Sequence, residues 1–130
     1  FRPTLFHQFK IRNSNGRLPT MKLLTKAQTT KLLANGANPD ADHKPVVKLF
    51  VPWGAATWLV TELDPTDPDI AFGLADLGFG SPELGSFSLS ELASIRGPLG
   101  LKIERDMHFT ADKPISAYAD EARGLGRIAA

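Results

Sequence analysis

Carboxylates crowd one short stretch of the chain, and carboxylates can hold hard cations or transfer protons. Residues 62–69 run Glu-Leu-Asp-Pro-Thr-Asp-Pro-Asp. Asp64, Asp67 and Asp69 could ligate Mg²⁺ or Ca²⁺, but their spacing is not that of an EF-hand loop. Asp-Pro pairs are also common in turns, where Asp accepts local hydrogen bonds and Pro fixes φ. The sequence favours a turn without a metal and leaves a cation site as the alternative.

A second group of ionisable residues follows from strand alternation. Glu62, Asp76 and Arg105 each fall on the apolar face of a predicted strand. Because an unpaired buried charge is costly, we expect Arg105 to pair with Asp76 or Glu62. Together the three residues could form a polar pocket that binds a small ligand or performs acid–base chemistry. A buried ion pair that fixes strand register explains the same pattern and is favoured.

Trp53 lies between Pro52 and Gly54, at the expected tip of a hairpin. Tryptophan is enriched among interface hot spots, so Trp53 is a candidate contact for a protein partner. The alternative is that its ring folds back onto the sheet edge. The sequence contains no histidine spacing typical of a zinc site, no Gly-x-Ser-x-Gly motif and no phosphate loop. No cofactor is therefore predicted.

These candidates must be positioned by an antiparallel sheet with a few helices. Period-two alternation predicts strands at Val46–Val51, Thr57–Leu63, Ile70–Leu77, Leu84–Leu89 and Leu101–Phe109.

Capping boxes at Thr25 and Ser88 predict two helices, the first over Lys26–Asn35 with Gly36 as a left-handed cap. A third helix with a stripe from Ile115 to Ala122 should stop at Gly124. Short connections favour antiparallel pairing. The predicted fold class is α+β: a four- to five-stranded mainly antiparallel sheet with two or three short helices packed on one face.

The length, composition and charge of the chain limit the number of domains and the kinds of partner that we expect. The 130 residues include no cysteine, which predicts one domain without a disulfide. We expect residues 1–20 to be an extraneous or flexible basic N-terminal arm and residues 21–130 to be a single α+β domain. Residues 51–90 contain six acids and no Lys or Arg, whereas residues 1–50 contain nine Lys or Arg and two acids. No apolar run is long enough to span a membrane, so no membrane partner is expected.

Several segments together resemble a known bacterial family. They are Lys44–Phe50, Ala55–Pro65, Asp67–Gly78, Pro82–Gly85, Ser88–Leu92 and Leu101–Phe109. The chain is similar in these segments, over roughly Met21 to Ile128, to the bacterial family named domain of unknown function 2958. The resemblance implies a cytoplasmic accessory protein of plasmids and integrative elements. It implies no catalytic residues.

Three functions remain open at this point. The first is a non-enzymatic protein-interaction or regulatory module that uses the acidic middle block and Trp53. The second is a metal-dependent hydrolase or nuclease-like enzyme, and the third is a nucleic-acid binder. The second would use the acids Glu62, Asp64, Asp67, Asp69 and Asp76. The third would use the basic first half, namely Lys10, Arg12, Arg17, Lys22, Lys26, Lys31, Lys44 and Lys48. The first is preferred, and the sequence does not decide the oligomeric state.

Overall fold

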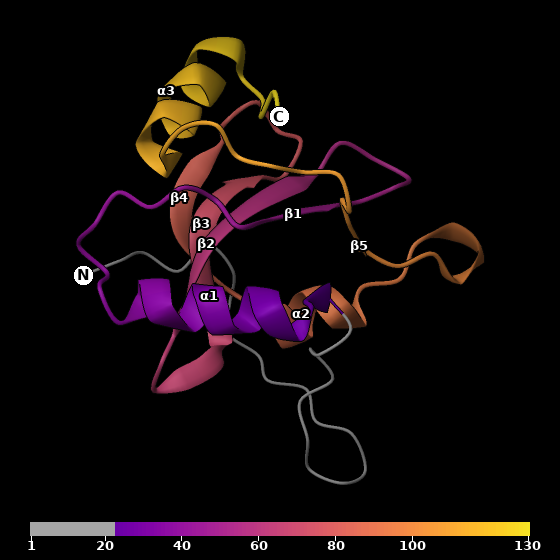
Figure 1. The fold of residues 1–130 in the computed structure, drawn as a ribbon. Coiled ribbons are helices and arrows are strands. Elements are labelled where there is room, and N and C mark those ends of the chain that lie inside the picture. The colour runs from indigo at the N-terminus through magenta and orange to yellow at the C-terminus, as the bar shows by residue number, and fades with distance from the viewer. Residues whose placement is uncertain (1–22) are drawn as a thin grey trace, which may run out of the picture.

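The computed structural model describes residues 23–130, in which five antiparallel strands form one sheet of order β4-β3-β2-β1-β5 (Figure 1). The strands are β1 (Val47–Phe50), β2 (Thr57–Asp64), β3 (Asp67–Asp76), β4 (Glu83–Ser88) and β5 (Glu104–Arg105). The helices are α1 (Lys26–Gly36), α2 (Leu89–Ser94), α3 (Ile115–Leu125) and a 3₁₀ turn, η2 (Pro98–Gly100). The predicted α+β class is confirmed. The predicted arm, residues 1–20, lies outside the described residues.

The helices cover both faces of the sheet, not one as expected (Figure 1). Leu32 of α1 and Leu92 of α2 pack with Trp58 and Val60 on one face, which we call the α1 face. The apolar stripe of α3 packs with Leu59 on the other, the α3 face. Both faces of β2 are therefore covered, and this explains why six consecutive residues of that strand are buried.

Two helices begin at the N-cap residues that the sequence predicts, α1 after Thr25 and α2 after Ser88. The Thr25 side chain accepts a hydrogen bond from the Gln28 backbone N–H (3.1 Å), and the Gln28 side chain accepts one from the Thr25 N–H (2.9 Å). Gly36, however, does not adopt the left-handed conformation that we expected. A Cβ at Gly36 would lie 1.8 Å from the carbonyl oxygen of Leu63, so glycine is needed here because α1 touches the β2 backbone. The left-handed cap of α3 is Gly126, with φ of 75°, and not Gly124.

A β-bulge in β2 changes which face its last residues point to. Val60 pairs with Gly73 and Glu62 pairs with Phe72, so Thr61 is an extra residue on β2. Two hydrogen bonds hold the bulge: the Asn35 side chain donates to the carbonyl of Thr61 (2.9 Å), and the Thr61 hydroxyl donates to the carbonyl of Phe72 (3.0 Å). Beyond the bulge, Glu62 lies on the α3 face instead of the predicted face of Trp58 and Val60.

The strand predicted over Leu101–Phe109 is largely absent, because only Glu104 and Arg105 pair with β1. Asp106 ends the pairing: its side chain accepts a hydrogen bond from the His108 N–H (2.9 Å), which turns the chain away from the sheet. Met107, which strand alternation would place on the same apolar face as Arg105, is 80% exposed. The apolar alternation in this segment is therefore not a sign of a long strand.

Candidate functional site

The acidic stretch comprises the end of β2, the tight turn at Pro65 and Thr66, and the start of β3, so it contains the turn that the favoured interpretation predicts. Asp64 pairs with Asp67, and the Asp64 Oδ1 accepts hydrogen bonds from the Thr66 hydroxyl (2.8 Å) and the Thr66 N–H (2.9 Å). The hydroxyl bond and then the backbone bond lower the pKa of Asp64 below its ordinary value. The Asp64 carboxylate thus stabilises its own turn.

Asp69 is buried under α2 and bound to two serines. Its Oδ2 accepts hydrogen bonds from the hydroxyls of Ser88 (2.8 Å) and Ser90 (2.9 Å), and its Oδ1 accepts one from the Ser90 N–H (2.9 Å). All three residues are at most 1% exposed. The Ser88 oxygen also accepts from the Glu91 N–H (3.2 Å) and so caps α2. Asp69 joins β3 to the start of α2 and faces away from solvent.

Asp76 lies at the far end of β3, where its side chain binds the backbone of the C-terminal segment at Ile128. Its Oδ1 accepts from the Gly78 N–H (2.9 Å), and its Oδ2 accepts from the Ile128 N–H (3.0 Å). The five acids proposed for a metal-dependent hydrolase are thus spread over the length of the β2–β3 hairpin. Residues 23–130 contain no group of three His, Asp or Glu side chains placed to hold a metal ion.

The polar pocket predicted from Glu62, Asp76 and Arg105 is not assembled. Arg105 pairs with Leu49 and so shares the α1 face. Its guanidinium donates to the carbonyl of Leu23 (3.0 Å). Glu62 and Asp76 both lie on the α3 face, so the sheet separates them from Arg105. The expected pairing of Arg105 with Asp76 or Glu62 is therefore wrong, because both carboxylates lie on the other face of the sheet.

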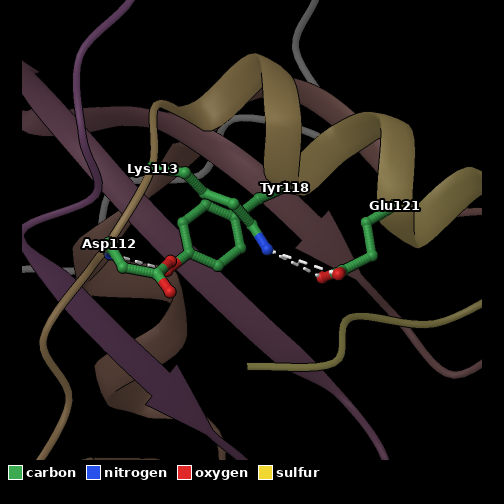
Figure 2. Close-up of polar contacts among 4 residues, drawn as sticks. All are labelled: Asp112, Lys113, Tyr118 and Glu121. Carbon is green, nitrogen blue, oxygen red and sulfur yellow. Dashed lines mark hydrogen bonds and ion pairs between the residues drawn. The ribbon is translucent and has the colours of Figure 1, made fainter.

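A polar cluster that sequence reasoning missed surrounds the start of α3 (Figure 2). The Tyr118 hydroxyl donates to Asp112 Oδ1 (3.0 Å) and accepts from the Asp112 N–H (3.2 Å). The Lys113 ammonium lies 4.5 Å from the centre of the Tyr118 ring and 3.3 Å from each carboxylate oxygen of Glu121. Burial raises the pKa of Tyr118 above its ordinary value.

The same cluster borders a polar pocket of about 330 Å³, which His108, Thr110 and Asp106 also line. The Tyr118 hydroxyl and the Lys113 ammonium are bound to Asp112 and Glu121 within the chain. These contacts hold the start of α3 against the segment before it. The pocket is thus bordered by groups that stabilise the fold.

Three loops lie at one end of the sheet, which we call the loop end: the β1–β2 turn that carries Trp53, the β3–β4 loop and the η2 loop. Thr57 pairs with both Phe50 and Asp76, so the β1–β2 turn (51–56) and the β3–β4 loop (77–82) leave the sheet side by side. The η2 loop (97–101) joins them, because a Cβ at Gly97 would lie 2.3 Å from the Trp53 ring. Trp53 is half-buried against this glycine, as the alternative interpretation of Trp53 expects.

The loop end carries apolar side chains that the fold does not cover. Phe79 is 85% exposed, Leu99 is fully exposed and Leu101 is 42% exposed. Leu99 also has φ of 58° and ψ of 22°, and it is the one residue other than glycine with positive φ among residues 23–130. This conformation costs a leucine about 1–2 kcal/mol. The sequence signal for this feature is the run Gly-Pro-Leu-Gly at residues 97–100.

Comparison with known proteins identifies the family of this chain. The model of a family described as "Protein of unknown function (DUF2958)" matches residues 23–129. The chain belongs to the DUF2958 family. The DUF2958 match spans every strand and helix described above, so the sheet, its bulge and the loop end all lie within the family region. No curated protein and no solved structure matches the chain.

Proposed function

We propose that this DUF2958 protein is a non-enzymatic interaction module that binds another protein through its loop end. Leu99 is the observation that carries the proposal. A fully exposed leucine in a strained conformation gives the isolated fold nothing, since it loses backbone energy and buries no surface. Strain of this kind is commonly associated with function. A partner that covers Leu99 would account for both features.

The acidic middle block contributes less to this proposal than the sequence suggests. Of its six acids, Glu62, Asp69 and Asp76 are buried. A buried carboxylate that is bound within the chain attracts a basic partner only weakly. The proposed contact surface is therefore apolar, with Trp53 as the support for the η2 loop.

The setting is also part of the proposal. The family resemblance supports a cytoplasmic accessory protein of a bacterial plasmid or another mobile element. Within residues 23–130, no helix is both long and apolar enough to cross a bilayer.

The two alternatives have less support from the described residues. A metal-dependent hydrolase would need its acids together, and Asp64, Asp69 and Asp76 are each bound to a different part of the chain. A nucleic-acid binder would need clustered cations. Of the eight proposed, four lie before residue 23, and Lys48 is 3.5 Å from the Asp106 carboxylate.

Photocrosslinking from the loop end tests the proposal. Benzoylphenylalanine replaces Leu99, Phe79 or, as a control, Met107, which is 80% exposed but lies beyond β5. We expect the same partner protein to be crosslinked from positions 99 and 79 in the native host, and not from 107. Equal crosslinking from all three positions, or none from any, would contradict the proposal. Leu99-dependent binding of the purified protein to phosphatidylcholine–phosphatidylserine vesicles would contradict it too.

A further inference from the structure

We propose that the loop end also binds a second copy of this chain, forming a two-fold dimer in which each Leu99 enters a pocket beside Phe79 of the other molecule. This inference goes beyond the proposed function, because it takes the same loop end and names a second copy of this chain as a protein that the loop end binds. The η2 loop protrudes from the loop end, and the β3–β4 loop borders a pocket that matches it in size and in charge.

The protruding element is the η2 loop, residues 97–101, which backbone hydrogen bonds keep in one shape. The Gly97 N–H donates to the carbonyl of Leu101 (2.7 Å), and the Leu101 N–H donates to the carbonyl of Pro98 (3.1 Å). Gly97 rests on the Trp53 ring, which anchors the base of the loop. Leu99 is therefore held outward before any partner arrives, and its ordering costs little on binding.

The receiving element is a pocket of about 200 Å³ at the β3–β4 loop, which we call the Phe79 pocket. Its lining is Ala75, Leu77, Phe79, Ser81 and Glu83. Most of this lining is apolar. A cavity of about 150 Å³ admits benzene, so the Phe79 pocket has room for a leucine side chain.

The charges around the two elements are complementary. Arg96 and Lys102 flank the η2 loop and are exposed, and the Arg96 guanidinium donates only to backbone carbonyls among the contacts of residues 23–130. Glu83, on the rim of the Phe79 pocket, is also exposed. A leucine entering this pocket would bring two cations toward a carboxylate, which favours this pairing over a neutral apolar site.

The strand order allows both Leu99–pocket contacts to form within a single two-fold dimer. The η2 loop comes shortly before β5 in the chain, and the Phe79 pocket includes Glu83 at the start of β4. These two strands are the opposite edges of the sheet (Figure 1). When two loop ends face each other, a two-fold axis perpendicular to the sheets sets each η2 loop opposite the pocket of the other molecule. Both contacts then form at once, as in the isologous interfaces that dominate homodimers.

Sedimentation equilibrium of the full chain, from micromolar to near-millimolar concentration, tests the dimer. We expect a reversible monomer–dimer equilibrium that stops at the dimer and weakens with added salt. The variant Leu99→Asn removes the apolar group from both contacts and should weaken the dimer by roughly 100-fold, about tenfold for each lost contact. The control Met107→Asn should dimerise like the wild type.

A mixing experiment tests the match between loop and pocket. Ser81 is exposed and lines the Phe79 pocket, so Ser81→Tyr should fill the pocket without disturbing the core. Leu99→Asn and Ser81→Tyr should each dimerise roughly 100-fold more weakly than the wild type, because each variant alone loses both contacts. Their mixture should form a 1:1 complex, because the intact pocket of one variant receives the intact leucine of the other.

Each other outcome overturns the inference. These outcomes are a wild-type chain that stays monomeric, assembly beyond the dimer, dimerisation of Leu99→Asn as tight as that of the wild type, or no complex in the mixture. A monomeric wild type would leave the proposed function to its own crosslinking test. Conversely, crosslinks from Leu99 to a second copy alone would support the dimer and contradict the proposed binding of another protein.

Discussion

The two ends of the sheet use their side chains in opposite ways. At the β2–β3 turn, the carboxylate of Asp64 is hydrogen-bonded within the chain, and the nearby Asp69 is buried with two serines. At the loop end, apolar Phe79 and Leu99 project into solvent although both could have been polar without loss to the core. The comparison teaches that the carboxylates, which have the most recognisable chemistry, stabilise the fold, whereas the exposed apolar residues make no such contribution and carry the proposed binding.

The largest expected effect comes from removing the buried carboxylate. Asp69→Ala leaves the Ser88 and Ser90 hydroxyls and the Ser90 N–H without their acceptor, which should cost about 3 kcal/mol. For a domain of this size the melting temperature should fall by about 10–20 °C. Differential scanning calorimetry measures the change.

Asp40 provides the matched control, because it is exposed and lies in the loop after α1. Asp40→Ala should change the free energy of unfolding by no more than about 0.5 kcal/mol. Equal effects of the two substitutions would show that the Asp69 network does not hold α2 to the sheet. The contrast between the two ends would then lose its main support.

A second substitution tests whether the contact between Gly97 and the Trp53 ring supports the η2 loop. A Cβ at Gly97 would lie 2.3–2.6 Å from Trp53 ring atoms, so Gly97→Ala should displace the ring at a cost of about 1–3 kcal/mol. Gly124 is helical with nothing within 4 Å of its added Cβ, so Gly124→Ala should instead stabilise by about 0.5–1 kcal/mol. Urea denaturation compares the two. If Gly97→Ala proves as harmless as Gly124→Ala, the η2 loop does not rest on Trp53.

The smallest effect concerns the pKa of Asp64. In Thr66→Val the hydroxyl donor is lost, so the pKa of Asp64 should rise toward its ordinary value. Because the folded-state pKa is depressed, this hydrogen bond stabilises the protein above the unfolded-state pKa and is lost as pH falls through the folded-state value. The stability difference between the two proteins should therefore vanish in acid. An NMR titration of the Asp64 carboxyl follows the pKa, and an unchanged value would mean that the Thr66 hydroxyl is not the donor.

Much of the fold follows from the sequence, and the errors have a common physical source. Alternation located β1 to β4 within a few residues, and Thr25 and Ser88 cap helices as predicted. Alternation could not reveal the bulge, because β2 is buried on both faces and an extra Thr61 leaves no polar residue out of place. The extra residue moved Glu62 to the α3 face, and Asp76 lies on that face too. Because both faces of the sheet are apolar, alternation could not show that Arg105 would lie on the α1 face, away from both carboxylates.

The loop end was only partly predictable. Trp53 was identified as a hairpin residue, but the sequence could not say that Gly97 would be its packing partner, because 44 positions separate them. Leu99 gives no signal beyond its flanking Pro98 and Gly100. Positive φ in a leucine contradicts local preference, and such conflicts become visible only in the structure.

One experiment on the Leu99→Asn variant tests the central claim most directly. Asparagine tolerates the left-handed conformation, so this change removes the apolar group while it relieves strain. The account predicts an unchanged or slightly higher melting temperature together with loss of the crosslink from benzoylphenylalanine at position 79. A melting temperature lowered by several degrees, with crosslinking intact, would show that Leu99 serves the fold and not a partner.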